Sequence, residues 1–440
     1  MNSDSQHEEV DAVVVGGGMA GLTVAAYVAR AGRSVVVLER SSRTGGRAIT
    51  EERNGYYFNL GPHALYTNGF AATVLNELGV DVSGGEPPQA GFALKDGRLH
   101  KLPVGPISLL STSLFGLGAK LEFGRIFAEL PRINASAADG LSLEEWLTRN
   151  TNRSAVGDLL RAVVRLATYA NDPKHLSAGV AIAQLQMALK GVLYLDHGWQ
   201  TLVDGVQAQA VEAGARIETG ASVLSVEQEG PAITVLLEDG RLYRTSTVIL
   251  ATPPKTAAEL LGAAGADLSS RAEAAEPVRV ATLDVGLSET PRPDARFVLG
   301  IDQPLYLSIH SGVGNLSPPG GTMLHVAKYL GDDTTGAKDV ERELEGFLDL
   351  AQPGWRDVLV EHRFLPNLIV VNALATAGTG GLRGRPDVAT DVKGVHLAGD
   401  WVGGEGWLVD ASLASAKRAA SAALESIPAP ARQAVVVGAV

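Results

Sequence analysis

The stretch "VVVGGGMAGLTVAAYVARAGRSVVVLER", residues 13–40, indicates how the chain begins to fold. A β-branched run over residues 10–15 predicts a buried parallel strand. A glycine-rich turn follows, then an alanine-rich helix over about residues 19–31 and a second strand over residues 35–38. Strand, turn, helix and strand in this register predict a unit that binds a dinucleotide.

The turn has the spacing G-x-G-x-x-G at Gly16, Gly18 and Gly21. The first glycine permits a tight turn, the second lets the backbone approach a pyrophosphate, and the third lets helix and strand pack closely. The helix begins at Met19 and Ala20, and the free N–H groups of its first turn face the same anion.

An acid stands at the end of the second strand. Glu39 can bind both hydroxyls of a ribose, and it would repel a 2′-phosphate. The adenosine half therefore belongs to NAD or FAD rather than to NADP. Arg40, the next residue, is counted with Glu39 among the expected cofactor contacts.

The composition excludes several classes of function. The chain has 440 residues, of which 45% are hydrophobic, and predicts a globular protein of more than one domain. A net charge of −12 argues against a nucleic-acid partner, because phosphates would be repelled. The absence of cysteine excludes disulfides, thiolate metal sites, a cysteine nucleophile and a flavin tethered through cysteine. Neither H-x-x-E-H nor H-E-x-x-H occurs, and we predict no metal site.

Two segments bear on localisation. Residues 1–9 lack the basic start and apolar middle of a signal peptide, so a cytoplasmic address is expected. The stretch "LPVGPISLLSTSLFGLGA", residues 102–119, carries no charge. Its prolines, glycines and serines favour packing in a core or substrate pocket over a spanning helix, with peripheral membrane contact as the other alternative.

A second anion site follows the first. "RSSRTGGRAIT" contains R-x-G-G-R, in which Arg43 and Arg47 surround Gly45 and Gly46. An NAD domain would normally run straight into its next helix. Instead the stretch "GYYFNLGPHALY" comes next.

With these motifs the chain resembles the superfamily of flavin-containing amine oxidases, phytoene desaturases and protoporphyrinogen oxidases. The resemblance implies an α/β fold, with a discontinuous Rossmann-type FAD-binding domain and an α+β substrate-binding domain. It implies FAD, which we expect to be non-covalent, with Gly46 and Arg47 near the pyrophosphate. The residues expected near the flavin ring are Gly61, Pro62, His63 and Ala64.

The far end of the chain supports this resemblance. "GVHLAGDWVGGEGWLVDASLASAKRAASAALES" predicts a strand over residues 396–398, then Gly399 and Asp400, a loop, and a helix. In the resembling family the aspartate hydrogen-bonds the ribityl chain or the adjoining phosphate. The helix, beginning near Leu408, Val409 and Asp410, would aim its positive end at the flavin pyrimidine.

Two internal pieces match less sharply. Val223, in "GARIETGASVLSVEQEG", matches a family position whose backbone clasps the adenine. Ala251 ends a predicted strand over residues 248–251, which family members bring close to FAD. As sequence alone, each piece is equally a plain strand of the core.

The motifs divide the chain into interleaved segments. We assign residues 9–90, 191–265 and 393–425 to the FAD-binding domain. Residues 91–190, mostly helical in pattern, and residues 276–390, with strand-like runs, would form the substrate-binding domain. Ser142 and Glu145 predict a capped helix in the first insert. Residues 426–440 look like a flexible tail.

The catalytic candidates are His63, His197 and Trp407. His63 lies in the flavin-edge turn and could act as acid–base or only orient a ligand. His197, in "YLDHGWQTLVDG", stands where the family commonly has Tyr-Pro-x-Gly-Gly, which makes it a candidate for the pocket or a surface loop. Amine oxidases carry an aromatic cage before the flavin; here Leu408 stands in one of its positions, although Trp407 could complete it.

Three functions remain open. The first is a phytoene-desaturase-like FAD-dependent dehydrogenase that desaturates a mainly apolar small molecule. The second is an amine or tetrapyrrole oxidase that returns electrons to O2. The third is a non-redox isomerase that carries FAD. The substrate, the electron acceptor and the oligomeric state are not determined by these motifs.

Overall fold

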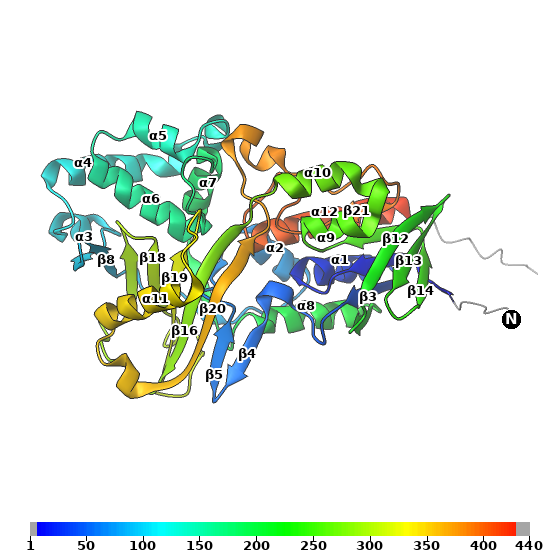
Figure 1. Cartoon of the computed structure of the whole chain (residues 1–440), viewed down its shortest axis with the longest axis horizontal. Coiled ribbons are helices and arrows are strands. Elements are labelled where there is room, and N and C mark those ends of the chain that lie inside the picture. Colours follow the sequence, from blue (N-terminus) through cyan, green and yellow to red (C-terminus); the bar gives the residue numbers. More distant parts are fainter. Residues whose placement is uncertain (1–6, 428–440) are drawn as a thin grey trace, which may run out of the picture.

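Five parallel strands form the central sheet of one half of the molecule, in the order β11-β3-β2-β15-β21 (Figure 1). The computed structural model describes residues 7–427. The strands are β11 (Arg216–Thr219), β3 (Val35–Glu39), β2 (Ala12–Val15), β15 (Thr247–Leu250) and β21 (Val395–Leu397). Every neighbouring pair is parallel. The strands predicted near residues 10–15, 35–38, 248–251 and 396–398 are therefore found, and both ends of the chain meet in this sheet.

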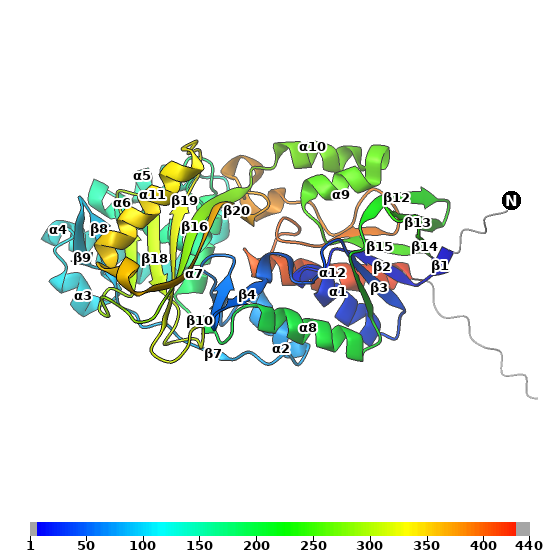
Figure 2. The same cartoon turned by 60° about the horizontal axis from the view of Figure 1, so that its bottom comes forward.

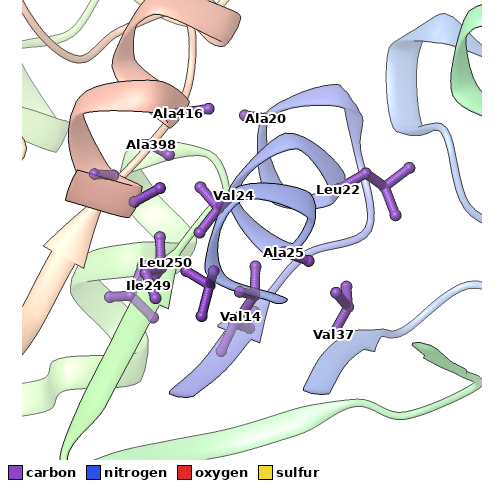
Figure 3. Close-up of a cluster of buried hydrophobic side chains, with 14 of the residues drawn as sticks. Val14, Ala20, Leu22, Val24, Ala25, Val37, Ile249, Leu250, Ala398 and Ala416 are labelled. Carbon is purple, nitrogen blue, oxygen red and sulfur yellow. The ribbon is translucent and has the colours of Figure 1, made fainter. Parts of the chain in front are cut away.

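Three helices pack on one side of this sheet. They are α1 (Met19–Arg30), α8 (Gln200–Glu212) and α12 (Val409–Ser426), and α1 contacts the other two. Figure 3 shows Ala20 and Val24 of α1 facing Ala398 and Ala416, with Val14 and Leu250 of the sheet below. Small side chains at these positions let the helices approach one another and the sheet closely.

The opposite side of this sheet carries a second, four-stranded sheet (Figure 2). Its strands are β1 (His7–Glu9), β14 (Leu242–Thr245), β13 (Ala232–Leu237) and β12 (Val223–Glu229). The helices α9 (Pro254–Leu261) and α10 (Ala266–Ala274) lie on the same side in Figure 2, away from α8.

The other half of the molecule is built on a seven-stranded sheet, in the order β20-β16-β19-β18-β17-β8-β9. The strands are β20 (Leu359–Val371), β16 (Val278–Leu287), β19 (Thr322–Tyr329), β18 (Leu305–Ile309), β17 (Phe297–Gly300), β8 (Phe92–Lys95) and β9 (Arg98–Lys101). The helix α11 (Ala337–Ala351) packs on one face, over an apolar core. The long strands β16 and β20 run toward the parallel sheet (Figure 1).

Helices gather at the far end of this sheet (Figure 1). They are α3 (Pro106–Ser111), α4 (Leu117–Glu129), α5 (Leu143–Asn150), α6 (Ser154–Thr168) and α7 (Ala178–Ala188). The predicted cap is confirmed: Ser142 Oγ accepts from Glu145 N at 3.2 Å, and Ser142 N donates to Glu145 Oε2 at 2.8 Å. The helical pattern of residues 91–190 is found, but β8 and β9 of the same segment join the sheet.

Short elements connect the two halves. The hairpin β4 (Thr50–Arg53) and β5 (Tyr56–Asn59) leads into a small sheet of order β6-β10-β7 and the helix α2 (Phe70–Glu77). The three strands of that sheet are β6 (Leu65–Tyr66), β10 (Val192–Leu195) and β7 (Gly84–Gly85). Of the predicted tail over residues 426–440, residues 428–440 lie outside the described range.

The uncharged segment over residues 102–119 is divided between a turn, α3 and the start of α4. Leu114 and Phe115 are buried, as core packing predicts, whereas Ile107 and Leu110 are 84% and 70% exposed. None of the helices in residues 7–427 combines the length and apolarity needed to cross a bilayer. Contact of the exposed side chains with a membrane surface stays a prediction.

We expect Gly21→Ala to destabilise the fold and Gly18→Ala to leave it nearly unchanged. A Cβ at Gly21 would lie 1.9 Å from Gly16 O, whereas a Cβ at Gly18 meets no atom within 4 Å. Overpacking of this kind costs roughly 1–3 kcal/mol or more. Thermal unfolding of both variants, followed by circular dichroism, measures the difference; equal melting temperatures would contradict the packing role of Gly21.

Candidate active site

The glycine turn and the R-x-G-G-R loop pack on each other. Gly16 has φ +106°, and a Cβ there would lie 2.6 Å from the carbonyl oxygen of Ala251, so only glycine fits. Gly45 N donates to Gly17 O at 2.8 Å, and Gly18 forms an isolated bridge with Gly45. The space beside Gly18 is open. An anion can therefore approach the backbone there, at the N-terminus of α1.

Glu39 is held at the end of β3 by two backbone amides. Its Oε2 accepts from Gly17 N at 2.6 Å and its Oε1 from Ser41 N at 2.8 Å. The backbone oxygen of Glu39 accepts from Ala221 N at 2.9 Å, which brings the start of β12 at Val223 to the same sheet end. Two predicted adenosine contacts are thus neighbours.

Arg47 and Asp400 form an ion pair at 2.8 Å, in which the Asp400 side chain is buried and the Arg47 side chain is 41% exposed. Asp400 also accepts from Asn372, at 3.0 Å from the backbone N–H and at 2.7 Å from Nδ2. Burial alone would raise the pKa of Asp400, but Arg47 and the Asn372 donors outweigh it and hold that pKa below its ordinary value. Arg47 also donates to Val370 O at 2.8 Å, so its guanidinium touches β20.

Arg385 is a further cation beside this pair, and no motif in the sequence marks it. Its Nη1 donates to Gly406 O at 3.1 Å, and its guanidinium lies over the Trp407 ring at 5.1 Å. Its Nε and Nη2 are buried without a partner. Burial lowers the pKa of Arg385 to about 10, and the charge of Asp400 opposes the shift. Unpartnered buried N–H groups indicate a site for a hydrogen-bond acceptor.

The start of α12 is strained and tied to α2. Leu408, just before the helix, has φ +57°, a conformation that a non-glycine side chain rarely adopts. Val409 is the first residue of the helix. Asp410 Oδ1 accepts from Ala71 N at 2.8 Å, so Asp410 caps α2, whose own N-cap, Gly69, has no side chain for this role. Burial raises the pKa of Asp410 to about 6.

Trp407 is anchored in the core. Its Nε1 donates to Thr168 O at 2.9 Å, and the side chain is among the largest fully buried ones. Its indole therefore lies against α6 and under Arg385, and Leu408 follows it in the chain.

The turn that carries His63 lies against β16. Gly61 has φ +77°, and a Cβ there would lie 2.8 Å from Thr282 Cγ2. His63 Nδ1 is 3.1 Å from Gly61 O, and the His63 ring meets Trp199 edge-on. Burial lowers the pKa of His63 to about 4, so the ring is neutral near pH 7. Pro62 O accepts from Tyr169 OH at 2.8 Å, which ties the turn to the end of α6.

A buried polar row crosses the seven-stranded sheet next to this turn. His325 Nδ1 is 2.7 Å from Asp284 Oδ1, and both side chains are fully buried. Asp284 Oδ2 accepts from Arg363 Nη2 at 2.8 Å. The ring of His310 lies edge-on to His325, with 4.6 Å between the centroids. No local sequence motif joins these four residues; the register of β16, β19 and β20 and the end of β18 bring them together.

Aromatic side chains surround this row. Tyr194 stacks on His310 with ring centroids 3.7 Å apart, and Tyr169 meets Tyr329 edge-on at 6.0 Å. Burial raises the pKa of each tyrosine in the group, so their hydroxyls stay protonated. The group consists of Tyr66, Tyr169, Tyr194, Tyr306 and Tyr329.

Some of the remaining residues predicted from the sequence lie near the cofactor turns or the buried polar row, and others lie away from both. His197 is exposed, has φ +57° and meets Tyr57 edge-on at 5.1 Å, so the structure does not bring it to the buried histidines. Arg40 is exposed beside Glu39. The buried or partly buried positions at the cofactor turns are Met19, Ala20, Ala64 and Gly399, and Gly46 is exposed.

One group of potential metal ligands occurs in residues 7–427, at Asp172, His175 and Glu276. Their ligand atoms lie within 4.8 Å of one another, and His175 and Glu276 are exposed. His175 Nδ1 is 2.7 Å from Asp172 Oδ2, which is an ordinary surface ion pair. The absence of a metal site stays a prediction.

The residues at the glycine turn, the end of β3 and the Arg47–Asp400 pair fit a bound dinucleotide. The open backbone at Gly18 suits a pyrophosphate, and the carboxylate of Glu39 stands where a ribose is bound in such folds. The unpartnered N–H groups of Arg385 suit an anionic or carbonyl oxygen. Fold and site thus define a dinucleotide-binding protein with mixed parallel and antiparallel sheets.

A family model described as "Flavin containing amine oxidoreductase" matches residues 19–424, and the chain belongs to this family. A putative flavin-containing monoamine oxidase AofH of Mycobacterium tuberculosis is 29% identical over 263 residues, which are 56% of this chain and 57% of that protein. A component of the limonene dehydrogenase of Castellaniella defragrans is 44% identical over 81 residues, 18% of this chain and 14% of that one. The chain thus spans about half, or less, of these relatives.

Solved structures share the fold. A crystal structure of an oxidoreductase from Methanosarcina mazei superposes with a TM-score of 0.75 at 19% identity, over 93% of this chain and 99% of that one. The family confirms the recognition made from the glycine fingerprint, and with it a flavin as cofactor. The roles of the individual site residues stay predictions.

We expect Asp410→Asn to stabilise the protein at pH 8 and to have a smaller effect at lower pH. The folded-state pKa of Asp410 is raised to about 6, so the folded protein holds a proton that the unfolded chain has already lost. Wild-type stability therefore falls as pH rises from about 4 to about 6. A shift of this size corresponds to roughly 3 kcal/mol.

Urea unfolding of both proteins at pH 5, 6 and 8 measures this difference. Asn keeps an oxygen that can accept from Ala71 N, so the cap is retained. A difference that stays constant with pH would show that Asp410 is not the titrating group.

We expect Glu39→Ala and Arg47→Ala to purify with less FAD than the wild type. One loses the carboxylate that is predicted to bind the ribose; the other loses positive charge and leaves Asp400 without its ion-pair partner. Loss of one charged hydrogen bond is worth about 1.5–3 kcal/mol, or roughly a 10- to 100-fold weaker affinity. The ratio of flavin to protein absorbance measures it, with Arg271→Ala, an exposed arginine of α10, as control. Full flavin in both variants would contradict the assignment.

Proposed function

We propose that the protein is an FAD-dependent dehydrogenase that acts on a neutral, mainly apolar small molecule. One observation supports this most. The carboxylate in the buried polar row is Asp284, and His325 and Arg363 occupy its two oxygens. A cationic substrate would need a free carboxylate or an aromatic cage. Leu408 stands at one cage position, and the indole of Trp407 is held by Thr168 O.

The limonene dehydrogenase relative supports the same substrate class. Limonene is an apolar hydrocarbon. Of the two relatives described above, the limonene dehydrogenase component has the higher identity over the segment that it shares with this chain. The surroundings of the buried row agree with it, because they are mostly aromatic and aliphatic. Dehydrogenation of such a molecule is the reaction that we propose for the class.

We also propose the division into two domains that the motifs predict. The parallel sheet draws its strands from residues 9–90, 191–265 and 393–425, and these would form the FAD-binding domain. The seven-stranded sheet draws its strands from residues 91–190 and 276–390, which would form the substrate-binding domain. The turn at Gly61 contacts Thr282 where the two meet.

When bound, FAD would accept a pair of electrons from the substrate. The residues of the chain supply binding and orientation. Glu39 would hold the ribose, Arg47 the pyrophosphate region, and the N-terminus of α12 would place its positive end near the pyrimidine. We propose that binding is non-covalent, because the chain has no cysteine and His63 Nδ1 contacts the backbone oxygen of Gly61.

A second candidate is an oxidase of amines or tetrapyrroles that passes electrons to O2. The family description and the monoamine oxidase relative favour it. A substrate amine would have to be bound neutral here, because the nearby carboxylate is already paired. Amine oxidation therefore ranks below dehydrogenation of a neutral molecule.

We expect anaerobic FAD-loaded protein to be bleached by limonene or its alcohol carveol, and not by cyclohexylamine. The three molecules share a six-membered ring and differ in polar group and charge. Loss of the flavin absorbance near 450 nm, recorded in a stopped-flow instrument, is the measurement. Bleaching by cyclohexylamine alone would overturn the proposal in favour of an amine oxidase. Absence of bleaching by all three would overturn it in favour of a non-redox role.

A further inference from the structure

We propose that His325 is the proton acceptor of this site and that His310 hydrogen-bonds the same substrate oxygen, so that the substrate is an alcohol on an apolar skeleton. This inference rests on the proposed function and names the reacting group of its substrate. It is carried by the buried polar row on the seven-stranded sheet.

The row is a product of strand register. His325 of β19 is paired with Asp284 of β16 on one side and with Ser308 of β18 on the other. Asp284 is paired in turn with Arg363 of β20. Directly paired residues point to the same face of a sheet, so the four side chains form a ladder. The alternate residues Leu283 and Val326 belong to the apolar core under α11, on the opposite face.

This face is buried and yet rich in polar atoms without a partner. Native proteins leave few such atoms, because each one loses its hydrogen bonds to water without replacement. Their concentration on one sheet face indicates a place for a ligand or ordered water. The unpartnered atoms are Thr282 Oγ1, Ser308 Oγ, His310 Nδ1 and Nε2, His325 Nε2, Tyr329 Oη and Arg363 Nε.

The contact with Asp284 sets the tautomer of His325. A carboxylate only accepts hydrogen bonds, so the Nδ1 of His325, 2.7 Å from Asp284 Oδ1, carries the proton. Nε2 is then left with a free lone pair, and it has no partner in the protein. Arg363 binds the other oxygen of Asp284 and supplies the counter-charge. A carboxylate that orients an imidazole in this way prepares it as a base.

His310 selects the polar group of the ligand. It is stacked on Tyr194, with an interplanar angle of 10°, and its edge meets the ring of His325. Burial and the neighbouring histidines lower the pKa of His310 well below its ordinary value, so the ring is neutral. A neutral imidazole offers one donor and one acceptor. A hydroxyl group also offers one of each, whereas a hydrocarbon offers neither and an ammonium group only donates.

The row begins beside the predicted flavin edge. Thr282 lies two residues before Asp284 on the same strand and face, and it contacts Gly61 of the His63 turn. Arg363 Nη2 also donates to the backbone oxygen of Asn59, just before that turn. A substrate bound at the row would therefore lie next to the turn that is expected to touch the flavin.

The reaction balances with the flavin as the oxidant. The O–H bond of the alcohol breaks and its proton passes to Nε2 of His325. The C–H bond breaks as well, and the hydrogen leaves with the bonding electrons to the oxidised flavin. The carbon–oxygen single bond becomes a double bond, so the alcohol is oxidised to a ketone or aldehyde and the flavin is reduced.

Groups from five elements surround His325 and would influence its protonation. They are Asp284 of β16, Arg363 of β20, His310 after β18, His63 after β5, and Glu51 of β4, which lies 3.6 Å from Arg363. The carboxylate Asp284 and the guanidinium Arg363 are already paired. A proton that arrives at Nε2 therefore adds one positive charge, stabilised directly by Asp284.

The first test measures proton uptake on binding of the product ketone. Carvone, the ketone of carveol, is titrated into oxidised, FAD-loaded protein by calorimetry in buffers of different ionisation enthalpy. A ketone oxygen only accepts, so a hydrogen bond from Nε2 of His325, beside the one from His310, requires that Nε2 gains a proton. We expect close to one proton to be taken up with carvone and none with limonene, and we expect His325→Gln to abolish the uptake. Equal uptake by wild type and His325→Gln would overturn the proposal.

The second test measures anaerobic bleaching by carveol as a function of pH. The wild-type rate should fall as pH falls, because protonation removes the lone pair of Nε2. His325→Gln should lower the rate by about 100-fold or more and flatten the profile, since loss of a general base typically costs 10²–10⁴. His396→Gln, at a buried histidine of β21 that contacts Ser426, is the matched control and should behave as wild type.

If His325→Gln does not fold, His310→Phe provides an independent test of the proposed site. Phenylalanine retains the stack on Tyr194 and removes both unpartnered nitrogens. We expect a higher melting temperature together with at least tenfold weaker binding of carvone and unchanged binding of limonene. Equal weakening for both ligands would overturn the role of His310. Bleaching by limonene with none by carveol would overturn this inference and leave the proposed function intact.

Discussion

The ion pair between Arg47 and Asp400 is the contact on which the site depends. Arg47 comes from the loop after the first strand–helix–strand unit, and Asp400 follows the last strand of the parallel sheet. Asn372 and Val370, at the end of β20, bind the same two side chains. The pair therefore joins the first and the last strand–helix units of the parallel sheet to the seven-stranded sheet. Removing Arg47 would leave the buried charge of Asp400 without its ion-pair partner, which typically costs about 3–5 kcal/mol.

Strand β16 extends this connection from the cofactor turns to the proposed chemistry. Thr282 touches the turn at Gly61, and Asp284 lies two residues further along the same strand. Groups placed on a strand in the middle of a sheet are held by ladder hydrogen bonds on both sides, which suits a site that needs fixed distances. The loops contribute the predicted cofactor contacts, and the sheet contributes the proposed proton acceptor.

Two strained backbone positions lie where the two halves of the site meet. Tyr169 and Leu408 are both non-glycine residues with positive φ, at the end of α6 and the start of α12. Such conformations persist only where surrounding contacts hold them. Tyr169 is held by its hydrogen bond to Pro62 O, and Leu408 lies between the anchored Trp407 and the capping Asp410. Both strained residues thus border predicted flavin contacts.

The sequence by itself determined the parallel sheet, the glycine turn and the family, because each is specified by residues that are close together in the chain. Glycine is required at positions 16 and 21 for a local steric reason, because a Cβ at either position would collide with a backbone oxygen. Only the tertiary structure decided the row of His325, Asp284 and Arg363. These residues come from three strands far apart in the chain, and strand register, which no short motif encodes, brings them into hydrogen-bond contact.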